Sequence, residues 1–182
     1  MNSFYSIEEL HNLGFKSVGK NVLISKKCSI YSPERISIGD NVRIDDFCIL
    51  SGEIKLGSHI HISAYAALYG ANGIEMENYT GVSPRTTIFS AMDDFSGDYL
   101  IGPIHPKEYI NVKGGNVILR QFSQLGAGTI VFPNINIGEG AVTGAMSLVN
   151  KDLTPWTINV GIPVHVLKKR RNDLKCLIKS NL

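Results

Sequence analysis

The sequence has few cysteines, little net charge and no long hydrophobic run, and each shortage excludes a class of protein. Three cysteines in 182 residues do not suggest a disulfide framework. A net charge of +2 is too mild to indicate a nucleic-acid partner. No run approaches the 18 or so apolar residues of a membrane-spanning helix, and the N-terminus MNSFYSIEELHNLGF carries carboxylates where a secretory signal needs an apolar core. We therefore expect a cytoplasmic protein with one compact domain and neither nucleic-acid nor membrane partners.

The sequence does contain a bulky aliphatic residue at every sixth position over long stretches. Neither an α-helix nor a simple strand requires this spacing. It predicts an all-β solenoid in which each short strand turns a corner after six residues, so that about 18 residues complete one triangular coil. Ile38, Leu56 and Ile74 are then expected to stack in one column. The repeat runs through Ile38, Ile44, Leu50, Leu56, Ile62, Leu68 and Ile74, continues after a two-residue slip as Met76, Val82 and Ile88, and returns as Leu119, Leu125, Val131 and Ile137.

A second repeat supports the triangular prism. Four residues after many of the aliphatics stands a small or slim residue, such as Cys28, Cys48 or Ala66. A narrow, close-packed interior needs one large and one small inward residue on each face. Both cysteines are therefore interpreted as reduced core residues. Glycine often follows the aliphatic directly, as at Gly57 and Gly126, where we expect a corner conformation that other residues resist.

Helices are predicted on both sides of the coils. Ser6 to Leu13 is expected to form a short helix, because Ser6 and Glu9 make a capping box and Gly14 stands where a helix C-terminus prefers glycine. A second helix is expected from about Val164 to Ile178. The predicted organisation is therefore a β-helix domain over residues 1–163 and a helical tail over residues 164–182.

The repeat is lost between residues 89 and 117. This segment contains SAMDDFSGDYLIGPIHPKEYINVKGG, with prolines, glycines, aromatic residues and charges. A long irregular loop inside a compact domain is usually functional. We therefore look for site residues in the loop and on the coils beside it.

The coils, the long central loop and the basic closing segment resemble the hexapeptide-repeat acyltransferases. The most specific stretch is LGAGTIVFPNINIGEGAVTGAMSLVNKDLTPWTINVGIPVHVLKKR, which is similar to the terminal coils and coenzyme-binding tail of that family. The resemblance implies a left-handed β-helix, a homotrimer with active sites between subunits, and acetyl-CoA or another acyl-CoA as co-substrate.

Within that family the sequence is most similar to a sugar N-acyltransferase branch. NVRIDDFCILSG, VSPRT and AMDDFSG carry this likeness. The O-acetyltransferase branch keeps a histidine base just beyond the coil where this chain reads Ile88 to Asp93. The N-acyltransferase branch, which includes the anthrose-pathway type, acylates the 4-amino group of a dTDP-linked 4-amino-4,6-dideoxy sugar. The resemblance places Ser83 and Asp93 beside the sugar amine as the catalytic pair.

The predicted chemistry suits those residue types. A neutral amine attacks a thioester without prior deprotonation, so it needs orientation, loss of its ammonium proton and a donor for the developing oxyanion. Asp93 is suited to holding the ammonium and accepting its proton, and Ser83 to orienting the amine or a water. A turn held by Asp93 and Asp94, and a coil hydroxyl satisfied by its neighbours, are the structural alternatives.

Further candidates line the expected substrate and coenzyme sites. Asp94, His61, Arg43 and Asp46 are predicted to contact the nucleotide sugar, although surface ion pairs and a structural histidine explain the same residues. For the coenzyme, small residues let a pantetheine arm approach the backbone, and lysines meet its phosphates as point charges, although a solvated helix face explains the lysines too. These residues are Ala127, Gly144, Ala145, Lys151 and Lys168.

No metal is expected. His59, His61 and His105 suggest comparison with the zinc-dependent γ-class carbonic anhydrases, which resemble this fold. Two ligands of those enzymes lie five residues apart, and no histidine pair here has that spacing. Two other functions stay open from the sequence alone. One is O-acetylation of a polysaccharide, sugar or antibiotic hydroxyl, and the other is a non-catalytic β-helix scaffold.

Overall fold

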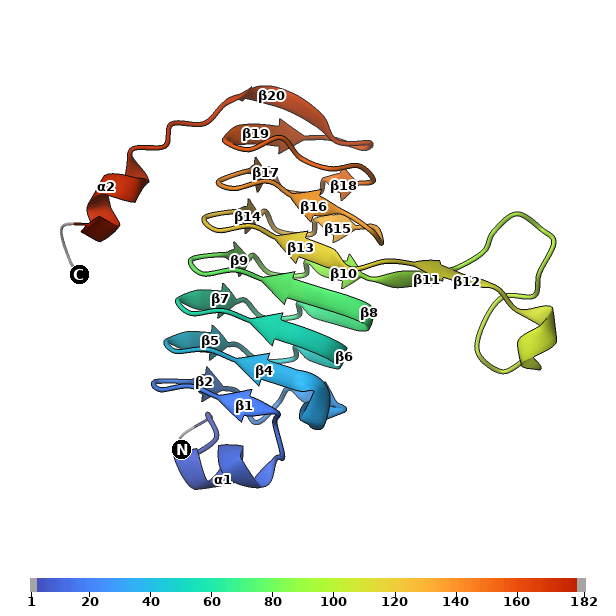
Figure 1. Cartoon of the computed structure of the whole chain (residues 1–182), viewed down its shortest axis with the longest axis horizontal. Helices are drawn as coiled ribbons and strands as arrows, with labels where there is room; N and C mark the ends of the chain where they lie inside the picture. The colour runs from blue at the N-terminus through green and yellow to red at the C-terminus, as the bar shows by residue number, and fades with distance from the viewer. Residues whose placement is uncertain (1–2, 180–182) are drawn as a thin grey trace.

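The chain winds into a left-handed parallel β-helix with three faces, as a computed structural model that describes residues 3–179 shows (Figure 1). Each coil contributes a short strand to each face, and each strand pairs in parallel with the strand of the next coil. We call the corner between the first and second faces corner A. The corner between the second and third faces is corner B, and that between the third and first faces is corner C.

The faces contain the following strands. The first has β2 (Leu23–Ile24), β5 (Val42–Ile44), β7 (Ile60–Ile62), β9 (Gly81–Val82), β14 (Gln124–Leu125), β17 (Val142–Thr143) and β19 (Thr157–Val160). The second has β3 (Ser29–Tyr31), β10 (Thr87–Phe89), β15 (Ile130–Val131), β18 (Leu148–Val149) and the first parts of β6 (Ile49–Leu56) and β8 (Ala67–Met76). The third has β1 (Ser17–Val18), β4 (Ile36–Ile38), β13 (Val117–Leu119), β16 (Asn136–Ile137) and the last parts of β6 and β8, which run around corner B.

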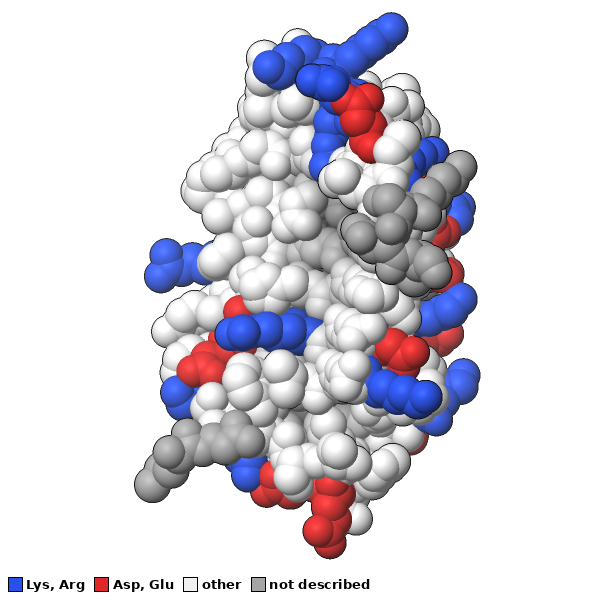
Figure 2. All heavy atoms as spheres, turned by 90° about the vertical axis from the view of Figure 1, so that its left-hand side faces the viewer, with Lys and Arg blue, Asp and Glu red and all other residues white. Residues whose placement is uncertain are grey.

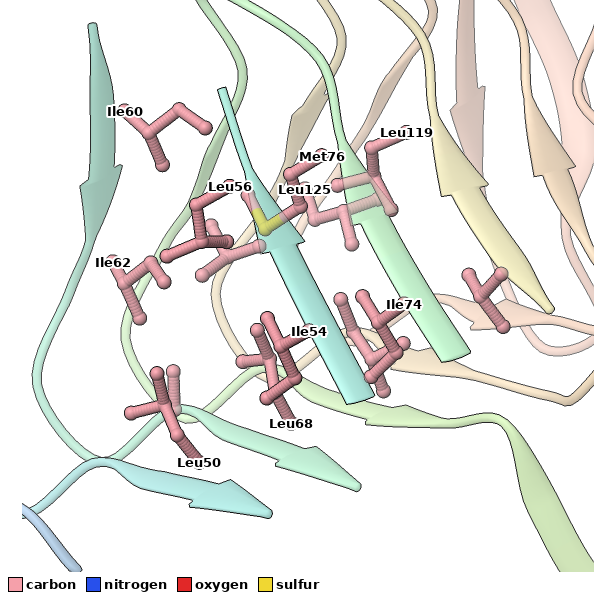
Figure 3. Close-up of a cluster of buried hydrophobic side chains, with 14 of the residues drawn as sticks. Leu50, Ile54, Leu56, Ile60, Ile62, Leu68, Ile74, Met76, Leu119 and Leu125 are labelled. Atoms are coloured by element: carbon pink, nitrogen blue, oxygen red, sulfur yellow. The ribbon is translucent and has the colours of Figure 1, made fainter. Parts of the chain in front are cut away.

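The predicted aliphatic repeat forms the core of the prism. The side chains of the repeat point inward from all three faces, and Leu50, Ile62, Leu68 and Leu125 are fully buried (Figure 3). The slim inward positions are filled by residues such as Cys48 and Ala66, as the second repeat predicted. Because each face lies close to the other two, the inward side chains of all three faces pack together and form most of the core.

One detail of the predicted columns is wrong. Ile38 pairs with Leu56 as expected, but Leu56 pairs with Met76, while Ile74 lies beside Ile54. The register between β6 and β8 shifts after Gly52, because β8 has two extra residues between Gly70 and Ile74. The predicted two-residue slip therefore lies before Ile74 and not between Ile74 and Met76. Ile74 and Met76 both point inward because they are two apart on one strand, so spacing alone could not place the shift.

The corners depend on left-handed backbone at residues that are not glycine. Asn41, Tyr65, Tyr79 and Trp156 all have φ between +55° and +63°. At corner C the rings of His59 and Tyr79 stack with centroids 4.7 Å apart, and Phe122 continues the stack at 5.5 Å. Stacking of this kind offsets part of the cost of the left-handed conformation.

The glycines after the aliphatic residues have a different role from the one predicted. Gly57 and Gly126 do not adopt a left-handed conformation. A Cβ at Gly57 would lie 2.9 Å from the backbone nitrogen of Asn78, and one at Gly126 would lie 2.6 Å from the carbonyl oxygen of Thr143. These positions need glycine because the next coil passes too closely for a side chain.

The N-terminal helix is confirmed. Helix α1 (Ile7–Asn12) begins after Ser6, whose hydroxyl accepts a hydrogen bond from the Glu9 amide, while the Glu9 carboxylate accepts one from the Ser6 amide. Gly14 follows with φ of 77°. Leu10 packs into the core beneath this helix and closes the first coil.

The C-terminal helix predicted from Val164 is wrong over its first half. Residues His165–Lys169 form strand β20, which pairs antiparallel with β19, and helix α2 covers only Leu174–Lys179. The last coil of a parallel solenoid leaves unpaired backbone groups at its edge, and a returning strand satisfies them. The basic residues Lys168 and Lys169 therefore lie on a strand.

The central loop leaves the prism at corner B as a hairpin of β11 (Ala91–Asp93) and β12 (Val112–Gly114) (Figure 1). Beyond this stem the loop contains one 3-10 turn, at Lys107–Tyr109, and another 3-10 turn, Pro33–Arg35, precedes β4 in the first coils. The loop exposes many large apolar side chains, including Phe95, Leu100, Ile101, Ile104 and Tyr109.

Charges are mixed over the surface. On the face in Figure 2, basic and acidic side chains lie interspersed along the prism, as expected for a small net charge. Within residues 3–179, neither helix has the length and hydrophobicity needed to span a bilayer.

A core substitution tests the packing of these inward side chains. Leu68 is fully buried, so Leu68→Ala should lower the free energy of unfolding by about 2–5 kcal/mol in urea denaturation. Leu167→Ala is the matched control, because Leu167 is 58% exposed on β20 and should cost less than about 1 kcal/mol. Equal effects of the two substitutions would contradict this account of the core.

Candidate active site

Polar side chains lie on the first face and at corner A beside it. Ile62, Val82 and Leu125 point inward, so the residues on either side of each point outward from β7, β9 and β14. His61, Gly81 and Gln124 are direct neighbours across these strands. Ser83 follows two residues after Gly81, where the chain enters corner A.

Arg43, Asp45 and His61 form one hydrogen-bonded cluster at this place. Arg43 and His61 pair across β5 and β7, and both reach Asp45: the Arg43 Nε lies 2.7 Å from one carboxylate oxygen and the His61 Nε2 lies 2.7 Å from the other. Burial acts to raise the pKa of the Asp45 carboxyl, but the hydrogen bonds from Arg43 and His61 outweigh it and hold this pKa below its usual range. Asp45 thus fixes His61 through one ring nitrogen and leaves the other for a ligand.

Asp46 faces the first coils. Its carboxylate accepts hydrogen bonds from Lys27 at 2.7 Å and from the Ser25 hydroxyl. These hydrogen bonds, that of Lys27 first, lower the pKa of the Asp46 carboxyl. The contacts join neighbouring coils, and the predicted contact of Asp46 with a nucleotide sugar stays a prediction.

Ser83 has a hydroxyl that is not used by the fold. Its amide donates to Leu125 at 2.9 Å and its carbonyl accepts from the Thr86 hydroxyl at 2.8 Å. Within residues 3–179, its Oγ makes no hydrogen bond to another protein group. A half-buried serine with a free hydroxyl at the edge of a polar cluster is suited to binding a ligand.

Asp93 and Asp94 have opposite environments at the base of the hairpin. Asp93 ends β11, opposite Val112, and its half-buried carboxylate has no partner in the described part of the chain. Asp94 is 6% exposed and binds Lys113 at 2.9 Å, the Asn111 amide at 2.8 Å and the Ser96 backbone N–H at 2.9 Å. Its ion pair with Lys113, and then the bond from Ser96, hold the pKa of the Asp94 carboxyl well below its usual range.

These contacts indicate different roles for the two aspartates. Asp94 joins both strands of the hairpin, which favours the turn-holding role over substrate contact; its predicted contact with the sugar stays a prediction. Asp93 is presented by that hairpin with its carboxylate available. No sequence pattern indicates Asn111 or Lys113, because their pairing with Asp94 depends on the antiparallel register of the hairpin.

The predicted coenzyme residues divide into two groups. Ala127, Gly144 and Ala145 lie together at corner A on successive coils, where a Cβ at Gly126 would lie 2.8 Å from the Ala145 nitrogen. Lys151 follows β18 and therefore lies at corner B, and Lys168 lies on β20 opposite Ile158. One chain thus has a strip of backbone and small side chains at corner A. Lys151 and Lys168 do not lie on this strip.

Arg170 has a structural position that sequence reasoning missed. Its guanidinium donates to the carbonyls of Phe122 and Gly140, at 2.9 and 2.8 Å, and lies over the Trp156 ring. Burial lowers the pKa of this guanidinium. The basic segment therefore includes at least one residue that fastens the end of the chain to corner C.

Across residues 3–179 no three His, Cys, Asp or Glu side chains are grouped so that they could hold a metal ion. The polar groups of one chain instead gather in two places. Corner A holds Ser83 and the small-residue strip, with His61, Arg43 and Asp46 beside them, and the hairpin at corner B holds Asp93 and Asp94 (Figure 1).

A prism of this kind, with a hairpin loop extruded from its middle and a strip of small residues along one corner, defines the hexapeptide-repeat acyltransferase class. No family model matches the chain. The chain is 41% identical over 169 residues to dTDP-4-amino-4,6-dideoxy-D-glucose acyltransferase of Escherichia coli, which covers 91% of this chain and 88% of the relative. The chain belongs to this family of sugar N-acyltransferases.

Solved structures agree with this assignment. AntD, an N-acyltransferase from Bacillus cereus, is 56% identical, with a TM-score of 0.97 over 100% of this chain and 97% of its own. That structure contains dTDP and 3-hydroxybutyryl-CoA. A variant of the same enzyme, 55% identical to this chain with a TM-score of 0.97 over 100% of this chain and 97% of its own, contains dTDP-4-amino-4,6-dideoxyglucose and CoA.

Removing the Asp94 charge should loosen the hairpin in a pH-dependent way. A carboxyl whose pKa is lowered by folding stabilises the fold above its unfolded pKa of about 3.9, and this contribution is lost as the pH falls through the lowered value. The Tm of Asp94→Asn should therefore lie below that of the wild type near pH 6. The difference in Tm between the two proteins should become smaller as the pH falls below about 4. Asp98→Asn, at an exposed position in the same loop, should have the same Tm as the wild type.

Proposed function

We propose that this protein transfers an acyl group from acyl-CoA to the 4-amino group of a dTDP-linked 4-amino-4,6-dideoxy sugar. The family membership carries this proposal: a relative of nearly the same length is named for that acceptor, and AntD binds dTDP, the amino sugar nucleotide and coenzyme A. The geometry of the chain supports it, because Ser83 and Asp93 both keep side-chain oxygens free for a ligand.

The proposed chemistry needs few protein groups. The lone pair of the neutral amine attacks the thioester carbonyl carbon, a C–N bond forms, and the tetrahedral intermediate breaks its C–S bond. The amine loses one proton and the leaving thiolate gains one, so the products are an amide and free coenzyme A. In this proposal Asp93 holds the incoming ammonium and accepts its proton, while Ser83 orients the amine or a bridging water. Solved AntD variants include replacements of one serine and one aspartate, which are the residue types assigned here.

The active site is proposed to lie between two chains of a homotrimer. Within one chain Ser83 lies at corner A and Asp93 on a hairpin that projects from corner B (Figure 1). The loop beyond that hairpin exposes large apolar side chains, with Ile104 87% exposed and Phe95 67% exposed, which a second copy of the chain would bury. A closed three-fold arrangement brings the hairpin of each chain to corner A of the next.

The paired His61 and Asp45 favour a second candidate, O-acylation, because a histidine held by a carboxylate is a usual base for a hydroxyl acceptor. Incubation with acetyl-CoA and a panel of dTDP- and UDP-linked amino sugars, beside their hydroxyl analogues, distinguishes the two by release of free thiol. We expect release with the dTDP-linked amino sugar. Release only with a hydroxyl acceptor, lost in His61→Ala, would replace the proposal.

Asp93→Asn should lower kcat by about a hundredfold or more, since a positioned base usually contributes at least this factor. The neutral amide keeps the size of the side chain but does not accept the ammonium proton. Asp98→Asn in the same loop is the control and should leave kcat within about twofold. An unchanged kcat/KM in Asp93→Asn would remove Asp93 from the mechanism.

The shared site is tested by mixing two inactive variants. A chain of 19.9 kDa should elute as a trimer of about 60 kDa in light-scattering chromatography. Equal amounts of Asp93→Asn and Ser83→Ala chains, unfolded and refolded together, should regain about one quarter of the wild-type activity, because one neighbouring pair in four carries both intact residues. Each variant refolded alone should stay inactive. A monomer, or no recovery in the mixture, would contradict a site between chains.

A further inference from the structure

Gln124 lies close to Ser83 on the first face and is not one of the proposed catalytic residues. Gln124 occupies β14 directly beside Gly81 of β9, and His61 of β7 lies on the other side of that glycine. All three residues point outward from the first face, because Ile62, Val82 and Leu125 point inward. In this row of outward residues, Gly81 therefore leaves a gap between His61 and Gln124.

The Gln124 side chain lies over Gly81. A Cβ built on Gly81 would lie 2.7 Å from the Gln124 Oε1 and 3.3 Å from its Nε2. Gly81 is buried although it faces outward, which the covering carboxamide explains. Only a glycine leaves room for the carboxamide in this place.

The carboxamide has unused hydrogen-bonding capacity. Neither the Oε1 nor the Nε2 of Gln124 bonds to another group within residues 3–179. The Ser83 hydroxyl, two residues from Gly81, is also without a protein partner, and His61 uses one ring nitrogen for Asp45. An amide supplies two donors and one acceptor group, a hydroxyl supplies both, and the imidazole supplies one more. Three polar side chains in this part of the face thus have atoms free for a ligand with both hydroxyl and amino groups.

The two sides of Gln124 suit different ligands. Toward Gly126, Ala127 and Gly144 the surface consists of backbone and small side chains, which suits the pantetheine arm of the donor. Toward His61 and Ser83 the surface is polar and suits a sugar. Because the carboxamide is folded onto Gly81, on the polar side, it faces the acceptor.

We propose that the Gln124 carboxamide is a positioning group for the acceptor, hydrogen bonding the amine and the adjacent hydroxyl of the amino sugar beside Ser83. This inference rests on the proposed function, since it names a residue that holds the same substrate. Gly81 then acts as a determinant of specificity, because its missing side chain sets the position of the carboxamide.

Three variants test this arrangement by steady-state kinetics with dTDP-4-amino-4,6-dideoxyglucose and acetyl-CoA. Gln124→Ala should lower kcat/KM for the acceptor by about tenfold to a hundredfold, the usual effect of removing a hydrogen bond to a charged or polar partner. The KM for acetyl-CoA should change less than about twofold. Gly81→Ala keeps the glutamine but forces its flexible end to move, so it should reproduce much of the loss. The double variant should be no worse than Gln124→Ala, because the two changes act on one contact.

Gln121→Ala is the matched control, since Gln121 has the same side chain but lies after β13 at corner C. It should leave both KM values unchanged. A rise in the KM for acetyl-CoA in Gln124→Ala, with the acceptor unaffected, would assign the carboxamide to the donor and overturn the inference. Additive losses in the double variant would also overturn it.

Calorimetry without acyl-CoA separates this inference from the proposed function. Gln124→Ala should bind the amino sugar nucleotide about tenfold more weakly than the wild type and bind dTDP itself equally well, because only the sugar is lost as a partner. Equal weakening of both ligands, or of neither, would overturn the inference while leaving the function intact. A wild-type protein that neither binds nor acylates the amino sugar nucleotide would end both proposals.

Discussion

The stacking of one coil on the next is the constraint on which the rest of the structure depends. Each strand hydrogen bonds to the equivalent strand of the next coil, so every outward or inward position is repeated along the prism. The interior is narrow, and inward side chains from different faces, such as Leu50, Ile62 and Leu68, pack together there (Figure 3). Residue size is therefore restricted at every step, inside by the facing side chains and outside, as at Gly57, by the coil above.

Much of the fold could be predicted from the sequence because this constraint is periodic. Ile62, Leu125 and the other aliphatics of the repeat mark the inward positions, and Ser6 with Glu9 marks the first helix. The coil register at Ile74 could not be predicted, since a strand holds inward residues at every second position and a two-residue insertion leaves the pattern intact. The strand at His165–Lys169 was missed because its reason is the open edge of the last coil, which local sequence does not show.

The candidate site could be predicted less well, since its residues meet through coil register and hairpin pairing. Arg43 and His61 are 18 residues apart, so the repeat already placed them side by side. Gln124 is 43 residues beyond Gly81, and only the return to register after the long loop makes them neighbours. The aspartate pair was identified, but which of the two is held by Lys113 depends on the antiparallel pairing of β11 with β12.

Coil stacking also explains how a rigid prism carries a site for two substrates. Outward residues on successive coils form rows in which neighbours lie about 4.8 Å apart, the spacing of paired strands. A row of small residues suits an extended arm, and a row of polar residues suits a sugar. Gly126 and Gly144 belong to the first kind of row, and His61 and Gln124 to the second. In the proposed site the reacting atoms meet where these rows adjoin, beside Ser83. Asp45 and Asp46 are already paired there, so in the proposed trimer the hairpin of a neighbouring chain supplies the free carboxylate, that of Asp93.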